Sequence, residues 1–166
     1  KFSERKFLME PKFSDELFKS IQASKNLTNN KAGVKWKGAS FCKDPFTTAI
    51  YLQLLQELKP KTVIEIGSFE GGSAVWFFDV LKSLDVESNI YSYDIDLSRI
   101  KFSNSKNIEF FNLDSNNIEE EFIFPDKIDR PLLIVDDAHV NLKNVLNFLY
   151  DLMHKGDYLV VEDTMP

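Results

Sequence analysis

The chain has 166 residues, of which 43% are hydrophobic and 28% charged, and its formal net charge is −6 at pH 7. This length suits one domain with a hydrophobic core. The negative charge and scattered lysines argue against a nucleic-acid partner or an anionic membrane surface, because both attract clustered positive charge. No apolar run approaches the roughly 20 residues that cross a bilayer, and no signal-peptide pattern opens the chain. Cys42 is the only cysteine, so no intrachain disulfide is possible and we expect a reducing, cytoplasmic location.

Residues 1–12 are mixed in composition and lack clear periodicity, so we expect them to form an arm. Ser14 is a candidate N-cap for a short helix. Residues 25–40 are rich in Asn, Lys, Gly and Ser, which predicts a loop. Trp36 in this loop could either cover a ligand pocket or fill part of the core. We therefore divide the chain into an N-terminal arm, short helix and loop (1–40) and a folded domain (41–166).

From Asp44 onward, helix signals alternate with strand signals. Asp44-Pro45 predicts a helix start, with an acidic N-cap and proline in the first turn, and this helix stops before Pro60. Strands that alternate with helices are typical of a Rossmann-like α/β fold, in which helices flank a parallel sheet. The predicted strands are 62–66, 89–93, 108–111, 132–135 and 158–161. The main predicted helices are one with Phe46, Ile50, Leu54, Leu55 and Leu58 on one side, one over 72–84, and one with Val140, Val145, Leu146, Leu149 and Leu152 that ends just before Gly156.

The first predicted strand runs into a turn that contains glycine. Gly67 ends the strand, and Gly71-Gly72 opens the next helix. A strand that turns into a helix through glycines lets backbone N–H groups approach a phosphate or an adenosyl ligand closely. Residues 67–72 lack the Gly-x-Gly-x-x-Gly spacing of dinucleotide-binding proteins, and Glu70 would crowd a pyrophosphate.

Acidic residues follow nearly every predicted strand. In an open parallel sheet, ligands bind beyond the carboxyl ends of the strands. Asp94 is placed there to accept hydrogen bonds from both ribose hydroxyls of a nucleoside, or it could cap the following turn. Asp114 could accept a hydrogen bond from an adenine amino group, or it could cap residues 115–121.

A further acidic group is predicted where the last two strands end. Asp136, Glu162 and Asp163 would converge there, and such carboxylates repel one another without a cation. Their hard oxygens suit Mg²⁺ or a similar divalent ion. Alternatively, Asp136 or Asp137 caps the next helix and the two later acids are solvated. His139 is the candidate catalytic base, because a neutral imidazole beside a metal-held hydroxyl can accept its proton.

Four short sequences occur in a characteristic order. They are Glu-Ile-Gly-Ser-Phe-Glu-Gly-Gly-Ser (65–73), Tyr-Asp-Ile-Asp (93–96), Asp-Asp-Ala-His (136–139) and Gly-Asp-Tyr-Leu-Val-Val-Glu-Asp-Thr (156–164). In this order they resemble the class I S-adenosylmethionine-dependent methyltransferases. The similarity is greatest to the cephalosporin hydroxylase family, which includes rhamnosyl and antibiotic O-methyltransferases. It covers roughly residues 36–165, and the last of the four sequences is the most specific.

The resemblance implies a cofactor, a metal ion and roles for individual residues. S-adenosylmethionine would contact Glu65, Gly67, Ser68, Gly72 and Ser73 at its methionine and ribose end, Asp94 at its ribose, and Asp114 and Ser115 near its adenine. Mg²⁺ would be held by Asp136, Glu162 and Asp163, with Asp136 favoured over Asp137 because of its spacing to His139, which matches the position of the base in such enzymes.

Members of this class usually continue after the fifth strand with a helix and two further strands, which this chain lacks. Together with the absence of an initial Met, this predicts a truncated or processed chain. The sheet edge that these elements would cover is then exposed or covered by a partner, and a homo-oligomer is one possibility.

We therefore predict an S-adenosylmethionine-dependent, Mg-dependent O-methyltransferase. By its resemblance, its acceptor would be a hydroxyl of a sugar or a natural-product-like small molecule. The ion would lower the pKa of this hydroxyl, His139 would accept its proton, and the hydroxylate would attack the sulfonium methyl group in line. Two alternatives stay open. One is a non-catalytic binding or assembly module that keeps the cofactor fold. The other is a dinucleotide-dependent oxidoreductase, which the glycine spacing disfavours.

Overall fold

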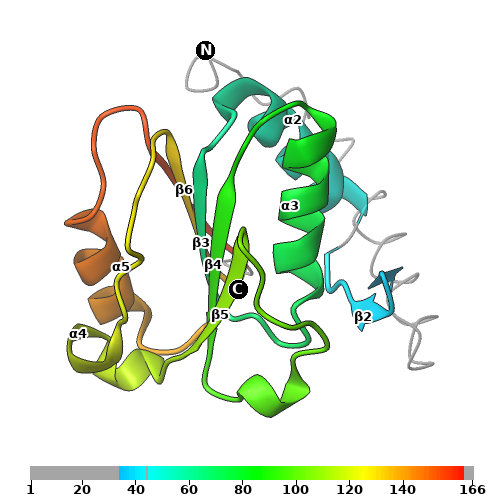
Figure 1. Cartoon of the computed structure of the whole chain (residues 1–166). Helices are drawn as coiled ribbons and strands as arrows, with labels where there is room; N and C mark the ends of the chain where they lie inside the picture. Colours follow the sequence, from blue (N-terminus) through cyan, green and yellow to red (C-terminus); the bar gives the residue numbers. More distant parts are fainter. Residues whose placement is uncertain (1–33, 44, 163–166) are drawn as a thin grey trace, which may run out of the picture.

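The computed structural model describes residues 34–43 and 45–162, and a five-stranded parallel sheet forms its centre (Figure 1). The strand order is β5-β4-β3-β6-β7, and each pair of neighbours runs parallel. The predicted Rossmann-like α/β fold is thereby confirmed. The strands are β3 (Thr62–Ile66), β4 (Asn89–Asp94), β5 (Ile108–Asn112), β6 (Leu132–Asp136) and β7 (Tyr158–Val161). The helix predicted from Ser14, as well as Asp44 and Asp163, lies outside the described residues.

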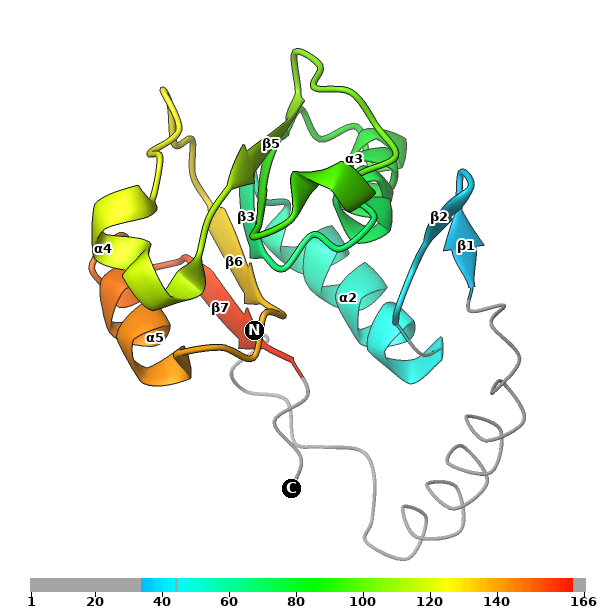
Figure 2. The ribbon, with the colours of Figure 1, turned by 90° about the horizontal axis from the view of Figure 1, so that it is seen from below.

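Helices cover both faces of the sheet. α2 and α3 pack on one face, and α4 and α5 pack on the other (Figures 1 and 2). Short 3-10 helices, η2 and η3, follow β4 and β5, and an antiparallel β1–β2 hairpin lies against α3. No helix in this part of the chain is long and apolar enough to span a membrane. The bounds are α2 (Pro45–Leu58), α3 (Gly72–Ser83), α4 (Ile118–Glu121), α5 (Leu142–Tyr150), η2 (Leu97–Arg99), η3 (Ser115–Asn117), β1 (Lys35–Trp36) and β2 (Ala39–Ser40).

The strand order also determines where a ligand can bind. The chain passes outward from β3 to β4 and β5, and then returns to β6 on the other side of β3. In parallel sheets with such a reversal, a crevice opens beyond the carboxyl ends of the strands that flank it. The loops after β3 and β6 are therefore the expected walls of a binding site.

Side chains on the strands alternate between two hydrophobic cores. On β3, Val63 packs among residues of α2 and α3, whereas Ile64 packs in the core that includes α5. Val135 of β6 and Val160 of β7 are paired across their strands, and both belong to the α2/α3 core. This period of two is the normal consequence of the pleated backbone.

The same alternation decides which acids face each other at the carboxyl edge. Glu65, Asp137 and Glu162 each lie two residues beyond a member of the α2/α3 core, so they belong to that face. Asp136 follows Ile134 of the opposite core, so its side chain belongs to the other face. The two neighbouring aspartates therefore have different surroundings.

The structure differs from the sequence-based expectation at residues 35–40. These residues form the β1–β2 hairpin instead of a loop. Trp36 fills part of the core: it packs against the α2/α3 core, and its Nε1 donates a hydrogen bond to Asp79 of α3 at 2.8 Å. The hairpin thus belongs to the packed structure.

The helix after β6 begins later than predicted. His139 and Asn141 have φ angles of 56° and 52°, which are incompatible with a right-handed helix, and α5 starts only at Leu142. Val140, which was expected on the buried side of this helix, is 42% exposed. The helix ends at Tyr150, so Gly156 lies in the turn before β7 and not next to the helix end.

The buried face of α2 also differs in part. Tyr51, Leu54 and Leu55 are buried, as spacings of three and four residues require for one helical face. Phe46 and Ile50, which were expected on that side, are 41% and 55% exposed. The burial of Tyr51 brings its hydroxyl group to the site described next.

Candidate active site

A cavity of about 420 Å³ opens beyond the carboxyl ends of β3, β4, β5 and β6. Its wall combines apolar side chains with a few polar groups, which is typical of small-molecule sites. The predicted site residues that line it are Gly67, Asp94, Asp114, Ser115 and His139. Glu65, Ser68, Gly72 and Ser73, which were also expected to contact a cofactor, are not part of its lining.

Gly67 allows two loops to approach each other at the wall of the cavity. Its φ is 103°, and a Cβ atom there would lie 2.8 Å from the carbonyl carbon of Asp137 and 3.0 Å from the nitrogen of Ala138. Glycine is therefore required for both conformation and space. The N–H of Gly67 donates to the carbonyl oxygen of Tyr93 at 2.8 Å, which ties the turn to β4.

Gly72 contributes to packing. A Cβ atom at this position would lie only 2.1 Å from the carbonyl oxygen of Ser40. The absence of a side chain thus lets the β1–β2 hairpin approach the first turn of α3. Glu70 holds the same contact, because it accepts a hydrogen bond from the Ser40 N–H at 2.7 Å and pairs with Lys101 at 2.6 Å.

Glu65 and Ser68 belong to a buried polar group beside the turn. Ser92 donates a hydrogen bond to Oε2 of Glu65 at 2.5 Å, and the hydroxyl oxygens of Ser92 and Ser68 lie 2.5 Å apart. The other oxygen of Glu65 has no hydrogen bond of good geometry among the described residues. Burial raises the pKa of Glu65 to about 7, against the opposing effects of the Lys43 charge and of the Ser73 and Ser92 hydroxyls.

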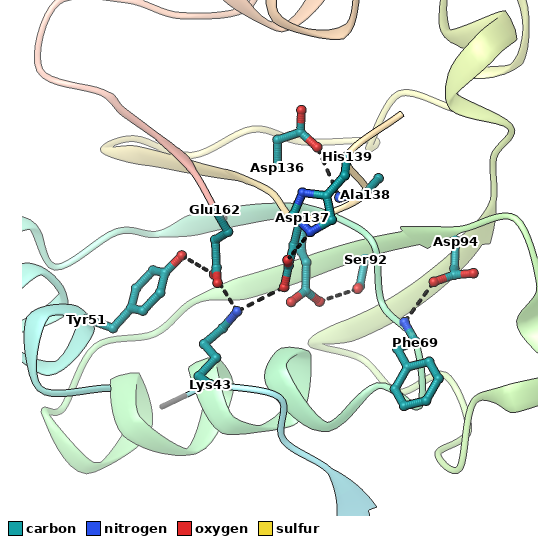
Figure 3. A network of polar contacts seen from close by, with 11 residues as sticks. Lys43, Tyr51, Phe69, Ser92, Asp94, Asp136, Asp137, Ala138, His139 and Glu162 are labelled. Atoms are coloured by element: carbon teal, nitrogen blue, oxygen red, sulfur yellow. Dashed lines mark hydrogen bonds and ion pairs between the residues drawn. The ribbon is translucent and has the colours of Figure 1, made fainter. Parts of the chain in front are cut away.

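Asp94 is held in a fixed orientation at the end of β4 (Figure 3). Its Oδ2 accepts a hydrogen bond from the N–H of Phe69 at 2.7 Å, and its Oδ1 accepts one from the N–H of Asp96 at 2.9 Å. Both alternatives for this residue are thus compatible: Asp94 supports the local turns and also lines the cavity. Each carboxylate oxygen has a second lone pair, so Asp94 can still accept hydrogen bonds from a ligand.

Asp114 and Ser115 lie on the β5 side of the cavity. Oδ1 of Asp114 accepts a hydrogen bond from the N–H of Asn116 at 2.9 Å, which is the capping role that the sequence left open. Asn141 connects this loop to the one after β6, since its Nδ2 donates to the carbonyl oxygen of Ser115 at 3.1 Å. The loops after β5 and β6, which both line the cavity, are therefore held together.

A buried lysine lies between the carboxylates on the α2/α3 face (Figure 3). Nζ of Lys43 pairs with the carboxylate of Glu162 and lies 3.2 Å from Oδ2 of Asp137. The hydroxyl group of Tyr51 donates to the same Glu162 oxygen at 2.6 Å. The repulsion expected between acids at the strand ends is thus relieved by a cation from the chain itself.

Burial and mutual charge shift the pKa values in this group in predictable directions. Burial by itself lowers the pKa of Lys43, but the carboxylates of Glu162, Glu65 and Asp137 outweigh it, and the net pKa is raised. Lys43 is therefore charged at neutral pH. Burial also raises the pKa of Asp137, whereas the Lys43 charge acts in the opposite direction.

His139 lies at the end of this polar chain. Its Nε2 is 3.2 Å from Oδ1 of Asp137, and its side chain is 47% exposed. The ring therefore contacts a carboxylate on one side while the residue lines the cavity. A carboxylate next to Nε2 favours the tautomer with hydrogen on that nitrogen, which leaves Nδ1 as the basic atom.

Asp136 does not lie with Glu162. Its side chain is on the opposite face, where Oδ1 accepts a hydrogen bond from the N–H of Ala138 at 3.2 Å and Oδ2 is buried without a hydrogen-bond partner among the described residues. Burial raises its pKa. Across residues 34–43 and 45–162, no three His, Cys, Asp or Glu side chains are grouped as metal ligands. Asp163 lies outside this range, so the predicted set of three stays a prediction.

The sequence did not indicate Lys43 and Tyr51 as residues of the site. The alternation along β6 and β7 could have shown that Asp137 and Glu162 share a face, because each lies two residues beyond a paired valine. Nothing in the local sequence indicates that Lys43 is buried, since lysine is normally exposed. Its burial depends on the tertiary fold, which brings this residue to Glu162 after β7 and to Asp137 after β6.

Comparisons with known proteins show which family the chain belongs to. A model of the family "Rhamnosyl O-methyltransferase/CmcI" matches residues 29–165. A rhamnosyl O-methyltransferase from Mycobacterium leprae is 33% identical over 140 residues, which are 78% of this chain and 59% of the relative.

Solved structures of CmcI are similar to this chain in fold and sequence. A Mg-SAM structure has a TM-score of 0.73 and 35% identity, covering 79% of this chain and 57% of CmcI. A structure with SAH has a TM-score of 0.69 and 34% identity, over 78% of this chain and 61% of that one. This chain therefore spans less than two thirds of the length of each of these relatives. It belongs to the rhamnosyl O-methyltransferase/CmcI family.

Proposed function

We propose that this chain forms the cofactor-binding and catalytic part of an S-adenosylmethionine-dependent O-methyltransferase. The observation that supports this most directly is that Gly67, Asp94 and His139 line one cavity at the carboxyl edge of the sheet. Membership of the family supports the same activity. Methyl transfer between two bound molecules requires that the cofactor and the acceptor be held in one site. In this proposal Asp94 binds the nucleoside part of the cofactor, and His139 is the base on the same cavity.

In this proposal the cofactor lies along the wall formed by the loops after β3, β4 and β5. Asp94 accepts hydrogen bonds from the ribose hydroxyls with the lone pairs that the backbone does not use. Asp114 and Ser115 lie near the adenine. The remaining predicted contacts lie outside the lining of the cavity and support the shape of the turn. They are Glu65, Ser68, Gly72 and Ser73. When bound, S-adenosylmethionine supplies the methyl group.

His139 acts as the base toward the acceptor hydroxyl. Asp137 holds its Nε2 at 3.2 Å, which presents Nδ1 as the proton-accepting atom. Positioned imidazole bases typically contribute about 10²–10⁴-fold to a rate. Asp137 in turn is fixed by Lys43, so the orientation of the base depends on the whole polar chain.

The carboxylates at this edge have the chemistry of Mg²⁺ ligands. Glu162 and Asp137 offer hard oxygens on one face, and the buried Oδ2 of Asp136 has no partner among the described residues. We propose that Glu162 and Asp163 hold the ion together with an aspartate of the Asp136-Asp137 pair, and the shared face favours Asp137 over Asp136. When bound, the ion supplies a Lewis acid that lowers the pKa of the acceptor hydroxyl.

The acceptor is proposed to be a sugar-like hydroxyl, because the curated relative is a rhamnosyl O-methyltransferase. The test is to mix the protein with S-adenosylmethionine, Mg²⁺ and methyl α-L-rhamnoside or other small glycosides, and to measure S-adenosylhomocysteine. Formation of product that depends on the glycoside would support the proposal. Cofactor binding without product from any glycoside would contradict the sugar acceptor, and binding of NADH instead would contradict the whole proposal.

A further inference from the structure

Lys43 is the only lysine or arginine that is buried among the residues the structure describes. Its side chain is 1% exposed. A lysine is rarely placed in such surroundings unless it is paired, because the removal of an ammonium ion from water is costly. Its position therefore needs an explanation beyond the packing of α2.

The partners of Lys43 provide that explanation. The ammonium group contacts Glu162 and Asp137, and it lies 5.4 Å from the centre of the Tyr51 ring. Glu162 also accepts the hydrogen bond from Tyr51, and its side chain is 10% exposed. The lysine thus supplies one positive charge to the two carboxylates that share the α2/α3 face.

We propose that Lys43 is the resident counter-ion of the Asp137–Glu162 pair, and that a divalent ion binds these carboxylates only by displacing its ammonium group. This inference rests on the metal site of the proposed function. A divalent ion held by the same oxygens would meet a positive charge at contact distance, and two cations in so buried a place repel strongly. Lysine and metal are therefore alternatives.

Displacement of Lys43 also links the metal to the base. Asp137 contacts Lys43 through Oδ2 and His139 through Oδ1. Withdrawal of the ammonium group frees Oδ2 while the contact to His139 can persist. The lysine would thus hold Glu162 and Asp137 in a binding-ready arrangement before the ion arrives.

In the first test, wild-type protein and Lys43→Met are titrated with Mn²⁺ alone, and the binding is measured by calorimetry. Removal of the competing charge is expected to tighten Mn²⁺ binding by about tenfold or more. Lys43→Arg keeps the charge and should bind Mn²⁺ no more tightly than wild type. Lys106→Met, at an exposed position, is the matched control and should leave binding unchanged.

Unchanged or weaker Mn²⁺ binding by Lys43→Met would overturn the displacement model. Glu162→Gln separates this failure from failure of the metal site. If wild type binds Mn²⁺, Glu162→Gln does not, and Lys43→Met equals wild type, the site stands and Lys43 is only a structural partner. If neither wild type nor Lys43→Met binds Mn²⁺ at millimolar concentration, the metal site and the displacement both fall.

If Lys43→Met does not fold, chemical labelling of the wild-type protein tests displacement of Lys43 instead. Wild-type protein is treated with an amine-reactive label with and without Mn²⁺, and the labelling rate of each lysine is measured by mass spectrometry. Mn²⁺ is expected to raise the labelling rate of Lys43 severalfold and to leave that of exposed Lys106 unchanged. Unchanged or slower labelling of Lys43 in Mn²⁺ would contradict displacement.

Discussion

The position of His139 depends on its own backbone conformation and on its contact with Asp137. A φ of 56° turns the residue out of the path of a helix, and Asp137 then contacts its Nε2. A non-glycine residue with positive φ carries some strain, and such residues concentrate at functional sites. The sequence placed a histidine near the carboxylates but could not show this conformation, because it depends on the loop after β5 to which Asn141 is bonded.

His139→Ala is expected to lower the rate of methyl transfer by about 10²–10⁴-fold while the affinity for S-adenosylmethionine stays nearly unchanged. The reason is that the imidazole acts on the acceptor and not on the cofactor. Single-turnover rates and calorimetric titration measure the two quantities separately. His154→Ala is the matched control, since His154 is exposed after α5. A transfer rate equal to that of wild type would remove His139 from the mechanism.

At the scale of elements, the strands of the sheet could be predicted from the sequence, whereas the β1–β2 hairpin and the start of α5 could not. The ranges 62–66 and 158–161 agree with β3 and β7 because β-branched runs between turn residues are a strong signal. The β1–β2 hairpin was missed, since two-residue strands have almost no pattern and depend on contacts with α3. The late start of α5 was missed because positive φ angles at His139 and Asn141 override the apolar periodicity.

The close approach of the hairpin to α3 gives a prediction for Gly72. Gly72→Ala is expected to destabilise the fold by about 1–3 kcal/mol, because the new Cβ would overlap the Ser40 carbonyl. Below its melting temperature the variant should bind S-adenosylmethionine nearly as well as wild type. Urea unfolding and calorimetry check the two statements, with Lys82→Ala on the exposed side of α3 as control. A stable variant that has lost cofactor affinity would show that Gly72 contacts the cofactor directly.

At the scale of the whole molecule, the fold collects ionisable groups on one face of the sheet. Glu65 is fully buried there, and the charged groups that influence it are Lys43 and Asp137. The sequence predicted an acidic edge from the strand ends. It could not predict the buried cation within it, because Lys43 precedes α2 and meets Glu162 only through the tertiary fold.

The raised pKa of Glu65 predicts a pH-dependent stability. In the unfolded chain this carboxyl loses its proton near its ordinary value of 4.5, whereas in the fold it keeps the proton up to about pH 7. Between these values the folded state binds more protons, so stability falls as the pH rises. Glu65→Gln removes this effect, and its stability relative to wild type should increase by about 2–3 kcal/mol between pH 5 and pH 8.

Urea unfolding at the two pH values measures this difference. Glu87→Gln, at an exposed position, is the control and should follow wild type at both. If Glu65→Gln differs from wild type by the same free energy at pH 5 and pH 8, the carboxyl of Glu65 does not titrate between these values in the folded protein, which would contradict a pKa of about 7.

In the proposed function, the cavity beside Asp94 binds S-adenosylmethionine. Calorimetric titration of the folded protein with S-adenosylmethionine tests it most directly, with circular dichroism to verify folding. We expect binding in the micromolar range, and Asp94→Asn should weaken it by about tenfold or more, because hydrogen bonds to a charged carboxylate are lost. A folded wild-type protein that shows no binding, or an Asp94→Asn variant that binds as tightly as wild type, would contradict the proposed cofactor site.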